Sequence, residues 1–244
     1  MSRPFRLLIF SRTTAYRHAS IPAGIQALCR LASASSGGPH PCTADHTEDP
    51  AVFCPESLST YQVIVLLQCS GEFLDDAQLG ALKGFVRSGG GVVAVHCASF
   101  AMQSSEWYGR LIGAVFDTHP DPQIGRVRIP DPAHPIMACQ CTAVGGDGSI
   151  THAPELQERL WLDEWYNFKA HPRTSSPRLN VLITVDENSY DGGIHGDDHP
   201  IAWCQTFDGG RCFYTSLGHF DEAYEDGWFM GQLLGGILWC AGLL

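Results

Sequence analysis

The sequence predicts an α/β fold with a parallel sheet that helices cover on both faces. Three short segments, Arg6–Phe10, Gln62–Leu67 and Gly91–His96, each contain an unbroken apolar run and are separated by segments with helical signals. Strands without polar alternation are typical of parallel sheets buried between layers of helices. The chain has 244 residues, of which 44% are hydrophobic and 17% charged, enough for one large core. We expect a single domain over residues 1–244.

Capping residues mark the helices between these strands. Ser20 is expected to cap a helix over Ile21–Leu31. Asp75 and Gln78 have the spacing of a capping box, which predicts that a second helix begins there. A shorter helix is expected around Ser105–Ile112.

The second half of the chain has shorter strand candidates and more polar loops. Asp208–Gly210 has the composition of a hairpin turn, and Trp228–Leu243 predicts a closing apolar helix. The expected strands are Ile124–Ile129, Trp161–Phe168, Asn180–Val185, Ile201–Gln205 and Arg211–Ser216, and the expected loops are Cys139–Ile150, His171–Pro177 and His195–His199.

Charge and cysteine usage limit the classes of partner. The formal net charge is −11 and the Lys and Arg residues do not cluster, which argues against nucleic acid or a membrane surface as a partner. We expect a small-molecule partner, and self-association stays open. The sequence shows no signal peptide and no membrane-spanning run. The ten cysteines are therefore expected to be reduced in a cytoplasmic protein.

Six segments, taken in order, resemble the ThuA-like (trehalose-utilization) family, which is related to the class I glutamine amidotransferases. The resemblance covers nearly the whole chain and implies a flavodoxin-like, amidotransferase-like parallel sheet with extra short strands in the C-terminal half. The segments are Tyr16–Ile21, Gly89–His96, Leu111–Phe116 with His119-Pro120, Asp131–Pro135, Asp163–Tyr166, and His199–Trp203 with Gly210-Arg211 and Gly218-His219.

The resemblance also implies where a pocket lies. In the amidotransferases a strand ends in a tight turn that carries the cysteine nucleophile, and a late His-Pro-Glu supplies the base. Here His96 stands at the place of the nucleophile, Cys97 follows it, and His219 survives without the proline. Open α/β sheets bind ligands beyond the carboxyl ends of their strands, so we expect His96 and His219 in one pocket, with His18 at its rim.

We predict catalytic and substrate-binding residues on this basis. Imidazoles suit acid–base chemistry near neutral pH, and aromatic rings beside carboxylates suit a sugar, whose C–H faces stack and whose hydroxyls bind acids. Aromatic neighbours in a strand point to opposite faces, so at most one of Trp165 and Tyr166 can face the pocket. The predicted catalytic residues are His96, His219 and Glu164, and the predicted substrate-binding residues are His18, His119, Asp163, Trp165 and Tyr166.

Two alternatives remain open for these residues. His96 could be a buried histidine that holds the turn by a backbone hydrogen bond. A divalent metal stays open as a cofactor, although no local metal motif exists, so its ligands would have to meet from distant loops. We therefore assign no metal ligand and no cofactor from the sequence.

The sequence favours an enzyme acting on a carbohydrate or related polyhydroxylated or carbonyl compound, as a lyase, isomerase or hydrolase. The sugar link comes from the resemblance alone. A non-catalytic binding or regulatory module is the alternative, because the cysteine nucleophile is missing. The chain could also be a stand-alone enzyme recruited to specialised-metabolite biosynthesis. Cys97 as a displaced nucleophile is the least favoured, since one residue of slip turns its side chain away from the pocket.

Overall fold

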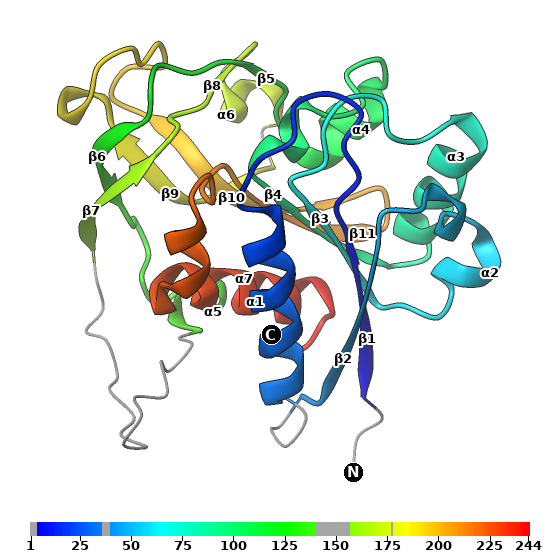
Figure 1. The fold of residues 1–244 in the computed structure, drawn as a ribbon. Helices are drawn as coiled ribbons and strands as arrows, with labels where there is room; N and C mark the ends of the chain where they lie inside the picture. Colours follow the sequence, from blue (N-terminus) through cyan, green and yellow to red (C-terminus); the bar gives the residue numbers. More distant parts are fainter. Residues whose placement is uncertain (1–3, 36–39, 140–156, 177) are drawn as a thin grey trace.

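A nine-stranded mixed sheet forms the centre of the molecule (Figure 1). The structure is a computed structural model and describes residues 4–35, 40–139, 157–176 and 178–244. The strands of the sheet are β1 (Phe5–Phe10), β2 (Cys42–Thr47), β3 (Val63–Leu67), β4 (Gly91–Val95), β6 (Gln123–Arg128), β7 (Glu158–Asp163), β9 (Asn180–Asp186), β10 (His199–Phe207) and β11 (Gly210–Thr215). A separate two-stranded sheet pairs β5 (Phe116–Thr118) with β8 (Asn167–Phe168).

The large sheet has a parallel half and an antiparallel half. Its strand order is β2-β1-β3-β4-β11-β10-β9-β6-β7. The first five of these strands are parallel neighbours, and each later pair is antiparallel. The predicted adjacency of β1, β3 and β4 is confirmed, and so is the α/β class. The short strands of the second half do not form a separate domain, because β6, β7, β9 and β10 continue the same sheet.

Helices cover both faces of the sheet, and each face has its own apolar core. The helices are α1 (Ile21–Ala34), α2 (Pro55–Leu58), α3 (Asp76–Arg87), α4 (Glu106–Ile112), α5 (Pro135–Ala138), α6 (Pro172–Ser175) and α7 (Gly227–Cys240), with 3-10 turns η2 (Pro50–Val52), η3 (His96–Phe100), η4 (Glu187–Ser189) and η5 (Asp221–Glu225). One core includes Leu28 of α1 and Phe229 of α7. The other includes Leu82 of α3 and Leu111 of α4. Figure 1 shows α1, α5 and α7 together on one side of the sheet.

The expected helix starts are borne out with one exception. Asp75 and Gln78 form the predicted capping box at the start of α3, and Ser105 caps α4 through the backbone N–H of Tyr108. Ser20, by contrast, makes no side-chain cap for α1. Its hydroxyl lies instead 3.4 Å from the carbonyl oxygen of Gly218, and this contact joins the start of α1 to a late loop.

Three strand expectations are wrong in instructive ways. β2 was not expected, because this edge strand carries the polar sequence Cys-Thr-Ala-Asp-His-Thr and so lacks an apolar pattern. The expected strand Trp161–Phe168 is interrupted after Asp163, and only Asn167 and Phe168 resume as β8. His199, which was assigned to a polar loop, begins β10 and is fully buried.

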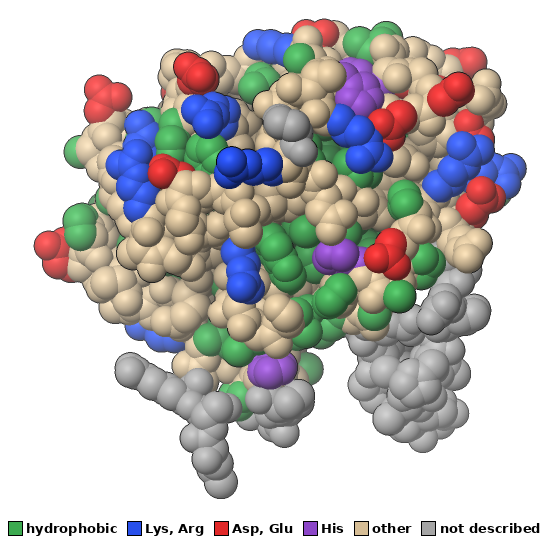
Figure 2. All heavy atoms as spheres, turned by 180° about the vertical axis from the view of Figure 1, so that it is seen from behind, with side chains coloured by type: hydrophobic (Ala, Val, Ile, Leu, Met, Phe, Trp, Pro, Cys, Tyr) green, Lys and Arg blue, Asp and Glu red, His purple; other side chains and the backbone are tan. Residues whose placement is uncertain are grey.

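The surface and the thiols have few special features. Figure 2 shows Lys and Arg scattered among Asp and Glu on the face opposite that of Figure 1. Within the described ranges, no helix is long and apolar enough to cross a bilayer. Nine cysteines are described and all are free, while Cys141 lies outside the described residues, as does most of the expected loop Cys139–Ile150.

Candidate functional site

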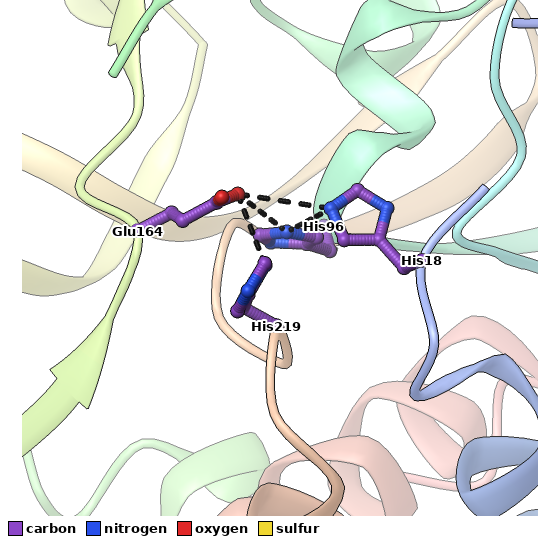
Figure 3. Close-up of side chains that lie close together, drawn as sticks. All are labelled: His18, His96, Glu164 and His219. Atoms are coloured by element: carbon purple, nitrogen blue, oxygen red, sulfur yellow. Dashed lines mark hydrogen bonds and ion pairs between the residues drawn. The ribbon is translucent and has the colours of Figure 1, made fainter. Parts of the chain in front are cut away.

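Four side chains from distant parts of the sequence converge beyond the carboxyl ends of the parallel strands (Figure 3). His18 lies in the loop between β1 and α1, and His96 follows β4 directly. His219 lies in the loop between β11 and η5, and Glu164 follows β7. Because β1, β4 and β11 are parallel, their carboxyl ends share one edge of the sheet. We call these four side chains the histidine–glutamate cluster.

The cluster has the dimensions of a metal-ligand set. His18 Nε2 and His96 Nε2 lie 3.1 Å apart, and Glu164 Oε2 lies 3.2 Å from His96 Nε2 and 3.1 Å from His219 Nδ1. Glu164 Oε2 also lies 3.7 Å from His18 Nε2, and the four ligand atoms are all within 4.8 Å of one another. Ligands bound about 2.1 Å from a tetrahedral metal ion are about 3.4 Å apart. The separations in the cluster scatter around that value.

His96 is held in a strained backbone conformation at the centre of the cluster. Its φ is 54°, in the left-handed region, which costs a non-glycine residue about 1–3 kcal/mol and is typical of functional sites. His96 Nδ1 lies 2.6 Å from the carbonyl oxygen of Ser216. A carbonyl can only accept, so Nδ1 carries the proton and Nε2 presents its lone pair to the cluster. His96 therefore holds the turn, as one sequence interpretation proposed, and also faces the other cluster residues.

His18 is a buried member of the cluster. Only 4% of the residue is exposed, so its expected place at the rim of a pocket is wrong. Burial lowers the pKa of His18 to about 4, His96 and His219 act in the same direction, and Glu164 acts against them. His18 is therefore neutral near neutral pH.

Cys97 contacts the Nδ1 side of the His18 ring, opposite the Nε2 atom that faces His96, and its surroundings do not favour a thiolate nucleophile. Its Sγ is 3.4 Å from His18 Nδ1 and donates to the carbonyl oxygen of Gln68 at 3.1 Å. Burial raises the pKa of the Cys97 thiol, and thiolate is the reactive form. The buried thiol packs against the apolar core on the α3 side of the sheet.

Glu164 and His219 form the most polar contact of the cluster. Burial alone would raise the pKa of Glu164, but hydrogen bonding with His18, His219 and His96 lowers it far below its usual range. Burial opposes protonation of His219, yet Glu164 and Asp163 together raise its pKa. His219 Nδ1 is buried and has no hydrogen-bond partner of good geometry among the described residues. An unsatisfied buried nitrogen requires an explanation, and a bound ion or substrate group would supply one.

The segment around Glu164 separates the predicted residues into two groups. Asp163 is fully buried, and both of its carboxylate oxygens accept hydrogen bonds from N–H donors. Trp165 is also fully buried. Its ring packs against Tyr190, and its indole N–H donates to the carbonyl oxygen of Gln123. The prediction that Asp163 and Trp165 contact substrate is wrong, because neither has free surface.

Tyr166 and His119 lie at the cluster itself. The Tyr166 hydroxyl is 2.9 Å from His96 Nε2, and the Tyr166 ring stacks with that of His119. His119 Nε2 lies 3.6 Å from Glu164 Oε1, and about a third of the His119 side chain is exposed. His119 Nδ1 faces the carbonyl oxygen of Pro120 at 2.8 Å, so Nε2 carries its lone pair toward the cluster. Substrate binding by these two residues stays a prediction.

Gln68 supports the cluster and was not found from the sequence. It follows β3, has a φ of 51° and is fully buried. Its amide nitrogen donates to the carbonyl oxygen of Gly218 at 2.7 Å, which holds the loop that carries His219. A polar residue directly after the apolar strand Val63–Leu67 is the only signal of this role in the sequence.

The donor set of the cluster fits a divalent cation. Three imidazole nitrogens and one carboxylate oxygen suit zinc and related first-row metals. The carbonyl of Ser216 fixes the tautomer of His96, as outer hydrogen-bond partners commonly do for ligating histidines. His18, His96, His219 and Glu164 could therefore hold one metal ion.

A groove lies near the cluster, next to Phe220, although none of the four cluster residues lines it. Phe220 lines the groove and meets the ring of His219 edge-on, with 4.5 Å between ring centroids. Trp161 supplies a second aromatic wall, and the carboxylate of Glu222 lies at the groove. Aromatic rings and an acid therefore occur beside the cluster, on residues other than those the sequence suggested.

Comparison with known proteins agrees with this architecture. The profile of the ThuA family, described as trehalose utilisation, matches residues 6–240. A ThuA-like protein from Bacteroides uniformis superposes with a TM-score of 0.74 at 22% identity, over 98% of this chain and 93% of that one. A ThuA-like protein from Parabacteroides merdae gives a TM-score of 0.69 at 18% identity, over 98% of this chain and 90% of that one.

A more distant likeness extends to part of a glycosidase. A cold-adapted beta-galactosidase from Rahnella sp. gives a TM-score of 0.52 at 12% identity, over 99% of this chain but 32% of that enzyme. At these identities the solved structures show the fold alone. No curated protein matched the chain. The family profile covers nearly the whole sequence, and the chain therefore belongs to the ThuA family.

Proposed function

We propose that this protein is an enzyme acting on a carbohydrate or a related polyhydroxylated or carbonyl compound, with a divalent metal ion held by the histidine–glutamate cluster. The observation that carries the proposal is the convergence of three imidazoles and one carboxylate at tetrahedral ligand spacing. With four protein ligands, such a metal ion would take a substrate carbonyl or hydroxyl oxygen as a fifth ligand, and polarising that oxygen would support lyase, isomerase or hydrolase chemistry.

The protein's own residues supply the remaining parts of such a site. About a third of the His119 side chain is exposed beside the cluster and its Nε2 has an available lone pair, so it is our candidate for proton transfer. The Tyr166 hydroxyl donates to His96 Nε2 at 2.9 Å, and a metal ion bound at that nitrogen would free the hydroxyl to donate to a substrate oxygen. Burial raises the pKa of Tyr166, which keeps this donor protonated.

The sugar-like substrate class is supported by two separate facts. The family is described by trehalose utilisation. The groove beside His219 joins Trp161 and Phe220 with the acid Glu222, which matches the stacking and hydrogen-bonding needs of a sugar ring.

A metal-free acid–base site is the second candidate, favoured by the opposite pKa shifts of two cluster histidines. The pKa of His219 is raised and that of His18 is lowered to about 4. The raised pKa favours the protonated form of His219 and the lowered pKa favours the neutral form of His18, and environments that move two pKa values apart are typical of an acid–base pair.

Metal analysis combined with a substrate screen tests the proposal. Protein purified without immobilised nickel should contain about one equivalent of a divalent metal, or bind one equivalent of added zinc. Turnover of trehalose, other disaccharides, aldoses and ketoses would be followed by NMR before and after chelation and metal restoration. Activity that survives complete chelation would favour the metal-free site. Absence of both metal binding and turnover would favour a non-catalytic binding module.

A further inference from the structure

Asp163 accepts four hydrogen bonds from N–H groups of two segments, its own stretch 161–164 and the loop at Gly218 and His219. Oδ2 accepts from the indole of Trp161 and from the backbone of Gly218, each at 2.9 Å. Oδ1 accepts from the backbone N–H of Glu164 at 2.9 Å and from that of His219 at 3.2 Å. Asp163 is 0% exposed, so a substrate cannot reach it.

One oxygen atom therefore binds the backbones of two cluster residues. Glu164 and His219 are 55 positions apart in the sequence and extend from different strands, so no local structure sets their separation. Asp163 Oδ1 accepts from the backbone N–H groups of both residues. Their side chains are also in contact, with Glu164 Oε2 3.1 Å from His219 Nδ1. A carboxylate that accepts several N–H bonds is a strong and directional anchor.

We infer that Asp163 is a positioning residue that fixes the Glu164–His219 separation, and with it the affinity and geometry of the cluster for a metal ion. The inference rests on the proposed metal centre. All four partners are donors, so the position requires an acceptor on both oxygens. The Gln68 side chain binds the same loop through the carbonyl oxygen of Gly218. It therefore does not compete with Asp163 for the backbone N–H groups of that loop.

Asp163→Asn is the direct test, because asparagine keeps the shape but offers only one acceptor oxygen. Its NH2 group must face one of the two pairs of N–H donors. We expect the zinc dissociation constant to rise by about 10–100-fold, the usual effect of losing an outer partner of a metal ligand. Competition with a chromophoric chelator measures the constant, and the absorption bands of bound cobalt report the coordination geometry.

Asp226→Asn is the matched control. Asp226 also accepts from two backbone N–H groups, those of Trp228 and Phe229, but it caps α7 and lies outside the cluster. This variant should lower the melting temperature and leave zinc affinity and the cobalt spectrum unchanged. A folded Asp163→Asn protein with wild-type zinc affinity and cobalt spectrum would overturn the inference.

Two further measurements keep the test decisive. If Asp163→Asn does not fold, Asp163→Glu keeps the charge but displaces the oxygens, and it should weaken zinc binding in the same direction. If the wild type binds no metal, the proposed centre fails, and amide hydrogen exchange then tests the positioning role by itself. Exchange at Glu164 and His219 should accelerate by about 10–100-fold in Asp163→Asn, as expected for losing hydrogen bonds to a charged acceptor. Unchanged exchange at both amides would contradict it.

Discussion

Two groups of histidines lie on either side of Tyr166 and differ in what their ring nitrogens contact. The histidine–glutamate cluster meets the hydroxyl of Tyr166, while His199 Nε2 faces its carbonyl oxygen at 2.9 Å. The second group comprises His171, His195 and His199, with Glu187 beside them. Both groups contain three imidazoles and a glutamate, so residue type alone does not distinguish them.

Most ring nitrogens of the second group take part in hydrogen bonds that hold the fold together. His171 Nε2 faces the carbonyl oxygen of Asp198, and His195 Nε2 accepts from the backbone N–H of Phe168. His199 is engaged at both nitrogens, by Glu187 and Tyr190 on one side and by Tyr166 on the other. These contacts join loops to β8 and β10.

The histidine–glutamate cluster directs its nitrogens inward instead. Nitrogens of His18, His96 and His219 face one another and Glu164, and His219 Nδ1 has no well-formed hydrogen bond among the described residues. Across the described ranges, only this group brings four ligand atoms within 4.8 Å of one another. Nitrogens that converge on one point, one of them without a hydrogen bond, therefore distinguish this cluster from the structural histidine network.

The largest expected effect comes from His219→Ala. Removing a direct ligand should weaken zinc binding by more than about 100-fold, beyond the loss expected for an outer partner. Stability should change little, because His18 and His96 remain beside the carboxylate of Glu164 when the His219 contact is removed. Calorimetric titration and thermal unfolding measure the two properties. A His219→Ala protein that binds zinc normally would remove the distinction between the two groups.

His199→Phe should have the opposite profile. The variant leaves the carbonyl oxygen of Tyr166 and the hydroxyl of Tyr190 without their His199 partner, which should cost about 1–3 kcal/mol of unfolding free energy. Zinc stoichiometry should remain that of the wild type. Denaturant unfolding gives the free energy. Loss of metal binding without loss of stability would contradict a purely structural role for this group.

The second group should also make the protein sensitive to acid. The pKa of His195 is lowered to about 4. Burial is the largest cause, His199 and His171 act in the same direction, and Glu187 opposes them. Its pKa in the unfolded chain is about 6.5, so the unfolded state binds more protons between these values. This contribution to stability is complete above about pH 6.5 and is lost as the pH falls toward 4.

His195→Gln isolates that contribution. Unfolding midpoints measured from pH 7 to pH 4 should fall less steeply in the variant than in the wild type. Equal slopes for the two proteins would show that His195 is not a source of the acid sensitivity.

The smallest effect is expected for Cys97→Ala. The Cys97 thiol is buried, burial raises its pKa, and sulfur is only a weak partner for His18 Nδ1, so the variant should keep most activity and lose less zinc affinity than Asp163→Asn. Removing a small buried side chain should lower the melting temperature slightly. A folded variant without turnover, beside a His96→Ala variant that still works, would restore the cysteine nucleophile.

The sequence by itself determined the parallel core and where its ligand edge lies. β3, β4 and all of β1 except Arg6 are apolar because helices cover both of their faces, and this pattern can be seen without coordinates. The Asp75 capping box is local, because its partners are three residues apart. The convergence of His18, His96 and His219 followed from the parallel strands that precede them.

Only the tertiary structure decided which neighbouring residues face the cluster. Glu164 and Tyr166 face the cluster while Asp163 and Trp165 do not, so the sides still alternate after β7 ends at Asp163. Periodicity predicts that neighbours take opposite sides, but the side that faces the cluster depends on the tertiary structure. Gln68 and Asp163 acquire their roles from Gly218, about 150 and 55 positions away along the chain. Periodicity describes neighbours in one element, whereas a carboxylate that joins two loops depends on how the sheet brings those loops together.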